Sequence, residues 1–217
     1  MRAYFFSNII QMKLMSYKNI FFLLLLPALM GSGLHKRPDR SAPAVKWIVE
    51  KNSTLSVEGK TNVNKFTCNI DQYVEKDTII CLDNASESIK LTGELKMDVL
   101  SFDCHSKLIT KDFRKTIKAD EYPVLTIRFL SLESMPLLHK KTELIKGWVE
   151  VELAGVVKKF ELNYSFLKST SGKIQLNGGR SFSFADFKLS PPKKLGGLVK
   201  IKDAFNVNFK LTLQPLI

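Results

Sequence analysis

The sequence is poor in the residues that build most active sites and metal centres. Its 217 residues include three cysteines and three histidines, His35, His105 and His139. No two histidines have the spacing of a shared metal site, and the HExxH, GxSxG and GxxxxGK motifs and the EF-hand loop are absent. His105 directly follows Cys104, and adjacent residues on a strand point to opposite faces, so the two are poorly placed as base and nucleophile. The sequence therefore predicts no catalytic residues, no metal site, no cofactor and no enzymatic activity.

Long hydrophobic runs are also rare, and the clearest one lies near the N-terminus. Residues 20–30 are apolar without interruption, Lys13 and Lys18 precede them without any acidic residue, and small residues follow. This arrangement is typical of a secretory signal peptide, and the run is shorter than the roughly 20 residues of a membrane-spanning helix. We therefore expect residues 1–33 to be a signal peptide and the protein to be exported, to the periplasm first of all or to the medium. An uncleaved membrane anchor is the alternative.

The rest of the chain has the size of one domain. Residues 34–44 are basic and carry two prolines, which predicts a flexible leader. Residues 45–217 have a normal length for a single domain. The net charge is +12, but the lysines occur as scattered pairs without a recognition motif, so we expect no nucleic-acid partner. The charge is compatible with transient contact with a membrane surface, and the sequence does not indicate an oligomeric state.

Apolar and polar residues alternate along most of this domain. The clearest examples are residues 160–166 and 205–213, in which every second side chain is apolar. A strand that buries one face and exposes the other has this period. The same pattern covers residues 52–60, 64–73, 77–82, 89–102, 124–133, 142–153 and 173–187. Ala154 and Gly155 join two alternating runs with almost no linker, which predicts a tight antiparallel hairpin.

One short helix is expected among these strands, at about residues 110–119. Thr110 can cap its first turn, Phe113 and Ile117 share one face, and Pro123 returns the chain to an extended path. Consecutive strands with short turns predict an all-β fold, a single antiparallel sheet of roughly eight strands. Closing the sheet into a barrel hides its edges. A β-sandwich is the alternative that periodicity leaves open.

The inward-facing rows of such a barrel are unusually aromatic. The candidate ligand-lining residues are Ile127, Phe129, Val149, Val151, Phe160, Leu162, Tyr164, Phe166, Phe182, Phe184, Phe205, Val207 and Phe209. An eight-stranded barrel has an interior wide enough for side chains or for one small ligand. The same residues can equally pack together as an ordinary core, because most apolar residues are interior filler.

The three cysteines fit an oxidising compartment better than a metal site. If Ser86 is the centre of a long hairpin, Cys68 and Cys104 are each 18 residues from it and lie opposite each other. An exported protein would then join them in a disulfide, with Cys81 left as a buried thiol. A bridge between Cys68 and Cys81, or three reduced cysteines, are the alternatives, because the sequence does not fix the connectivity.

The order of several motifs resembles that of the YceI-like family, often described as polyisoprenoid-binding. The resemblance covers most of the predicted domain and rests on five segments. They are WIVEKNS (residues 47–53), TKDFRKTIKADEYP (110–123), GWVEVELAGVVK (147–158), FSFADF (182–187) and DAFNVNF (203–209). In that family they would correspond to the Trp-centred first strand, the helix with its Tyr-Pro, the Gly-initiated hairpin and the last two strands.

The resemblance implies a lipocalin-like antiparallel barrel, usually exported from a bacterial cell, that encloses a long isoprenoid chain. We accordingly expect an apolar, isoprenoid-type lipid as the partner, bound in a carrier or sequestration role. Lys193 and Lys194 are candidate contacts for a phosphate or other polar head group. The rival hypothesis is a barrel with a filled core and no ligand, acting as an envelope interaction or stress-related protein.

Overall fold

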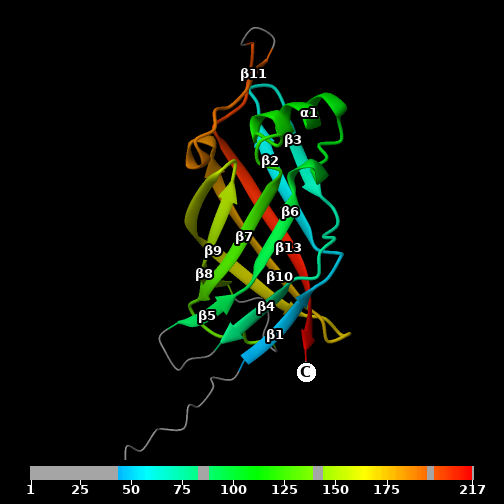
Figure 1. Ribbon diagram of the computed structural model, residues 1–217, viewed down its shortest axis with the longest axis vertical. Helices are drawn as coiled ribbons and strands as arrows, with labels where there is room; N and C mark the ends of the chain where they lie inside the picture. The colour runs from blue at the N-terminus through cyan, green and yellow to red at the C-terminus, as the bar shows by residue number, and fades with distance from the viewer. Residues whose placement is uncertain (1–43, 83–87, 139–143, 195–197, 217) are drawn as a thin grey trace, which may run out of the picture. The chain divides into compact units, whose positions relative to one another are not determined.

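The computed structural model describes residues 44–82, 88–138, 144–194 and 198–216, which form an antiparallel β-barrel (Figure 1). The strands of the barrel are β1 (Ala44–Val49), β2 (Thr54–Lys60), β3 (Lys65–Ile70), β4 (Thr78–Leu82), β5 (Ile89–Thr92), β6 (Glu94–Asp98), β7 (Val124–Leu132), β8 (Leu144–Leu153), β9 (Val156–Lys168), β10 (Ile174–Ser183) and β13 (Ala204–Leu216). Two short strands, β11 (Lys193–Lys194) and β12 (Val199–Lys200), pair only with each other. The predicted signal peptide, and the predicted leader apart from Ala44, lie outside the described residues.

Eight strands close the sheet. Their order around the barrel is β1-β4-β5-β7-β8-β9-β10-β13, and β13 pairs again with β1, from Lys46 opposite Leu216 to Val49 opposite Leu213. β2 continues the path of β1 along β13, and β6 continues that of β5 along β7. The expected antiparallel, roughly eight-stranded barrel is therefore confirmed. Closure pairs the backbone groups that the edges of an open sandwich would leave free.

Alternation along the strands separates the interior from the surface. On β9, Phe160, Leu162, Tyr164 and Phe166 are buried, and the residues between them are exposed or half-buried. The turn between β8 and β9 consists of Ala154 and Gly155, whose φ angles are 51° and 75°. Two successive residues with positive φ match the twist of a two-residue hairpin. The predicted tight hairpin is confirmed.

The one α-helix of the described residues, α1 (Lys107–Thr116), lies at one end of the barrel (Figure 1) and begins three residues earlier than expected. Ser106 is its N-cap residue, and Thr110 lies inside the helix instead of capping it. The Thr110 hydroxyl accepts a hydrogen bond from the backbone N–H of Cys104 at 2.9 Å and donates to Asp103 at 3.2 Å. Thr110 thus fixes the loop that precedes the helix, a tertiary role that a sequence pattern for capping does not distinguish from a cap.

Two predicted strands end earlier than the alternation suggested. Residues 99–101 form a short 3-10 helix, η1 (Val99–Ser101), and the chain after Ser183 forms another, η2 (Phe184–Phe187). The Ser183 hydroxyl accepts a hydrogen bond from the backbone N–H of Asp186, and the Asp186 carboxylate accepts one from the backbone N–H of Ser183. This reciprocal capping box favours a helical turn over continued strand. The expected strand over residues 173–187 is wrong beyond Ser183 for this reason.

The predicted disulfide forms, but the hairpin used to predict it does not. Cys68 on β3 and Cys104 after η1 are joined, with Cα atoms 3.9 Å apart. β3 pairs with β2, and Asn69 meets Asp103 through two backbone hydrogen bonds of 2.8 and 2.9 Å. The disulfide therefore connects β3 to the segment before α1. β3 and β6 are not paired with each other, as the two arms of the predicted hairpin would be. Cys81 on β4 is buried and lies outside this disulfide.

Candidate functional site

The barrel interior contains an apolar cavity at the end where α1 lies. Phe113 and Ile117, the helix residues expected to share a face, both line it, together with residues from β2, β3, β7, β8, β9, β10 and β13. Several lining side chains, including Phe66, Ile201 and Phe205, are only partly buried. The cavity therefore reaches the surface of the barrel instead of being sealed inside it.

The cavity is small for a lipid-binding barrel. The space open to the centre of a water molecule is about 90 Å³. Because its walls are apolar, a hydrocarbon group is a better occupant than water.

An aromatic layer separates the cavity from the packed part of the interior. Phe209 lines the cavity, and its ring centroid lies 6.4 Å from that of Phe129 and 6.0 Å from that of Tyr164. Beyond them Trp47 and Phe166 are 6.1 Å apart and almost completely buried. Rings at these separations fill the barrel as an ordinary core does. The interior is thus hollow in one part and solid in another.

Two polar atoms in the packed part have no hydrogen-bond partner among the described residues. They are the indole nitrogen Nε1 of Trp47 and the hydroxyl of Tyr164. Burial raises the pKa of the Tyr164 hydroxyl well above its usual range, because the charged form would lose its hydration. Tyr164 is therefore a neutral side chain of the core.

The predicted lining residues divide between the cavity and the core. Those that line the cavity are Ile127, Val149, Val151, Leu162, Phe182, Phe184, Phe205, Val207 and Phe209. Those buried outside its lining are Phe129, Phe160, Tyr164 and Phe166. The alternation predicts that all of these side chains point into the barrel, and each of them is buried or lines the cavity. Alternation alone does not tell which part of a row borders empty space.

Several lining residues were missing from the prediction. Leu55 and Val57 on β2 follow the same alternation and could have been found by it, as could Leu125 on β7. Phe102 and Phe187 lie at the last positions of the alternating runs 89–102 and 173–187, and the structure places them in 3-10 segments or at their ends. The most unexpected is Arg180, whose charged side chain belongs to the lining of an otherwise apolar cavity.

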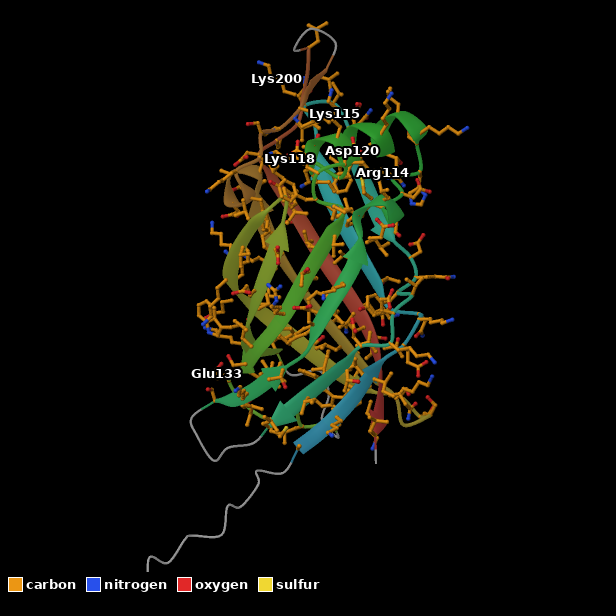
Figure 2. All side chains as sticks on the ribbon, viewed as in Figure 1. Arg114, Lys115, Lys118, Asp120, Glu133 and Lys200 are labelled. Atoms are coloured by element: carbon orange, nitrogen blue, oxygen red, sulfur yellow. A yellow bond between two sulfur atoms is a disulfide. The ribbon has the colours of Figure 1, made fainter. Side chains whose placement is uncertain are left out.

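Other charged side chains surround this end of the barrel without lining the cavity. Figure 2 shows Lys115, Lys118 and Asp120 on and just after α1, and Glu133 near the opposite end. The backbones of Lys193 and Lys194 pair with β12, but the placement of their side chains lies outside the described part of the structure. Their predicted contact with a head group therefore stays a prediction.

Within the described ranges, no group of three or more His, Cys, Asp and Glu side chains could hold a metal ion. The sulfur of Cys104 is bonded to Cys68, so it is not a thiolate nucleophile for the neighbouring His105. The His105 ring nitrogen Nε2 lies 3.3 Å from the side-chain nitrogen of Asn69.

Among the residues that the structure describes, no helix is long and apolar enough to span a membrane.

Comparison with known proteins gives matches only at the level of structure. No protein-family model matches the sequence, and no curated protein matches it. A polyisoprenoid-binding domain of Saccharophagus degradans, implicated in plant cell wall breakdown, is similar with a TM-score of 0.56. It is 14% identical, over 78% of this chain and 97% of that one.

Two further solved structures are similar. Burkholderia cenocepacia BcnA has a TM-score of 0.54 and 15% identity, over 74% of this chain and 95% of BcnA. The Campylobacter jejuni YCEI protein has a TM-score of 0.45 and 19% identity, over 65% of this chain and 81% of that one. The last score is too low to support an argument. Identities this low show a shared fold. The order of the barrel strands and the similarity to the first two structures together show that this chain has a lipocalin-like antiparallel barrel fold, shared with the polyisoprenoid-binding domain of Saccharophagus degradans and with BcnA.

Proposed function

We propose that this barrel binds the apolar chain of a lipid and acts as its carrier or store. The observation that supports the proposal is a cavity lined by apolar side chains from seven barrel strands and α1, with Arg180 as its charged exception among the described residues. Each buried methylene contributes about 0.8 kcal/mol, so five of them contribute about 4 kcal/mol without any polar contact. The similar domain of Saccharophagus degradans is described as polyisoprenoid-binding, which makes an isoprenoid the first chain to test.

The size of the cavity restricts how such a chain would bind. The space open to the centre of a water molecule in this cavity is about 90 Å³. Pockets for drug-sized ligands usually measure about 300–1,000 Å³. The cavity therefore accepts the end of a chain as it stands. A long chain would enter the barrel fully only if the aromatic layer of Phe129, Tyr164 and Phe209 moved. Otherwise the rest of the chain would stay outside the cavity.

The rival function is that of a filled barrel that binds other envelope components and no small ligand. The solid packing around Trp47, Tyr164 and Phe166 is what that hypothesis predicts for the whole interior. It does not predict an apolar cavity that reaches the surface, because unfilled apolar space costs stability. The cavity thus favours the lipid-binding hypothesis.

The protein is further proposed to work after export, in the periplasm or outside the cell. The disulfide between Cys68 and Cys104 supports this location, because disulfides persist in oxidising compartments and are rare in the cytosol. Edman sequencing or mass spectrometry of the protein from its native cells would test it. A mature N-terminus near residue 34 agrees with export, whereas an intact N-terminus in the cytosolic fraction contradicts it.

Lipid binding is tested by extracting the purified protein with organic solvent and identifying the extract by mass spectrometry. Val151 lines the cavity on β8, and Val157 is 52% exposed on β9 of the same hairpin. Val151→Phe should fill the cavity and lower the recovered lipid several-fold, while Val157→Phe, the matched control, should leave it unchanged. Thermal unfolding of both variants verifies that they fold. Absence of lipid from the wild-type protein, together with no uptake of an apolar fluorescent probe, would refute the function.

A further inference from the structure

Arg180 occupies a position where the strand pattern calls for an apolar side chain. On β10 the inward residues Ile174 and Leu176 precede it and Phe182 follows it, and all three are buried. Its register partner on β13 is Val207, which lines the cavity. Arg180 itself lines the cavity and is exposed to solvent. The side chain of Arg180 therefore extends from the apolar cavity to the solvent.

The hydrogen-bond ladder between β9 and β10 stops where Arg180 lies. Pairing between β9 and β10 ends at Gly179 opposite Asn163, although β10 continues to pair with β13 as far as Ser183. The first part of β9 pairs with β8 alone. We call this gap between residues 156–162 of β9 and residues 180–183 of β10 the seam.

The guanidinium of Arg180 lies across the seam and uses few of its donors. Its Nη1 donates to the backbone carbonyl of Glu161 at 3.0 Å. Its Cζ lies 5.0 Å from the ring centroid of Phe160 and 5.7 Å from that of Phe182. A guanidinium carries five N–H donors in a planar fork that matches a carboxylate or a phosphate. Among the described residues no carboxylate lies within ion-pair distance of Arg180.

Of the two cations that the structure describes beside the Phe160 ring, Arg180 is the one without an ion pair. Lys158 is the other cation beside Phe160, with its Nζ 5.5 Å from the ring centroid. That lysine forms an ion pair with Asp186, and its hydrogen bond holds the pKa of the Asp186 carboxyl below the usual range. Lys158 is thus neutralised by its partner, whereas the charge of Arg180 faces only aromatic rings, a carbonyl and solvent.

We infer that Arg180 is a head-group receptor and that the cavity selects lipids with an anionic head, a carboxylate or a phosphate. The chain would lie in the cavity and the head at the seam, where two N–H groups of the fork can donate to it. This inference rests on the proposed lipid binding. It adds the chemical class of the ligand and the residue that recognises it.

A merely structural role of Arg180, closing the seam through Phe160 and Glu161, makes a different prediction. In that case the loss of Arg180 would weaken the barrel and the binding of every ligand alike. A receptor role predicts a loss confined to anionic ligands. Ligands with the same chain and different heads therefore separate the two roles.

The experiment measures displacement of a neutral apolar fluorescent probe by dodecanol, dodecanoate and dodecyl phosphate. The wild-type protein should bind the two anions about tenfold more tightly than the alcohol, a difference of about 1.4 kcal/mol. Arg180→Gln should remove this preference and leave the affinity for dodecanol unchanged, and Arg180→Lys should keep part of it. The two anions tell a carboxylate head from a phosphate head. Lys159→Gln is the matched control, because Lys159 lies 4.7 Å above the Trp148 ring and outside the cavity lining.

Equal affinity of the wild-type protein for the three ligands would overturn the inference, as would a preference that survives in Arg180→Gln. An equal loss for all three ligands in that variant would assign Arg180 a structural role. If Arg180→Gln does not fold, the salt dependence of the wild-type preference replaces it, since an exposed ion pair weakens as salt is added. Failure of all three ligands to bind would instead refute lipid binding itself.

Discussion

The disulfide between Cys68 and Cys104 should be a large single contribution to the stability of this barrel. The two residues are 36 positions apart, and closing a loop of that length in the unfolded chain corresponds to roughly 3.8 kcal/mol at 25 °C. For a domain of this size each kcal/mol shifts the melting temperature by roughly 2–4 °C. The double variant Cys68→Ala/Cys104→Ala should therefore melt about 8–15 °C below the wild-type protein.

The structure also predicts what else this variant loses. The bridge holds the segment before α1 to β3, and Phe102 in that segment contacts Phe113 of α1 with centroids 5.1 Å apart. Both rings line the cavity. Without the disulfide this wall of the cavity depends on packing and on the backbone contact between Asn69 and Asp103, so lipid binding should weaken as well.

Thermal unfolding followed by circular dichroism measures the stability change, with reductant as the internal control. Reductant should lower the wild-type melting temperature by about as much as the double variant lowers it, and should leave the double variant unaffected. A shift below about 3 °C, or an effect of reductant on the double variant, would refute the loop-entropy reasoning.

Two further outcomes follow from local contacts. A hydrogen bond from Lys96 lowers the pKa of the Glu94 carboxyl below its reference value of 4.5, so its stabilisation is complete above that pH and is lost as the pH falls through the lower, folded-state pKa. Urea unfolding at a series of acidic pH values should show a shallower loss of stability in Glu94→Gln, and an unchanged slope would contradict this. Gly155→Ala should cost about 1–2 kcal/mol, because φ is 75° there and a Cβ would lie 2.7 Å from the Tyr122 Cζ atom. Gly172→Ala, at φ 81° with no atom within 4 Å of its Cβ, is the control for backbone strain alone, and an equal loss in both melting temperatures would exclude the contact with Tyr122.

The strands and the barrel were predictable because their signals are local. Alternation of period two identifies an inward face whatever the partner strand, which is why Phe160, Leu162 and Leu211 are buried as expected. Ala154 and Gly155 predict their hairpin for a similar reason, since the turn depends on the φ angles of two residues. The failures at the strand ends also have local causes. Ser183 and Asp186, which form a capping box, stand among alternating phenylalanines in the sequence, and the alternation predicts a strand there.

The disulfide is predicted correctly, but from an arrangement of strands that the structure does not have. Symmetry about Ser86 suggested that Cys68 and Cys104 face each other on one hairpin. In the structure β3 pairs with β2, and the cysteines meet at a single bridge between Asn69 and Asp103. Strand order is a property of the whole sheet, so no segment of sequence contains it.

The sequence by itself determined which side chains point inward and that those side chains are apolar. Only the tertiary structure decided where they leave space and where they fill it, because that depends on which rows face each other and on where the pairing of β9 and β10 stops. Tyr164 and Phe209 belong to rows that look alike in the sequence, yet one is core and the other borders the cavity. The same holds for Arg180, which reads as one more basic residue until the register places it among the inward positions of β10.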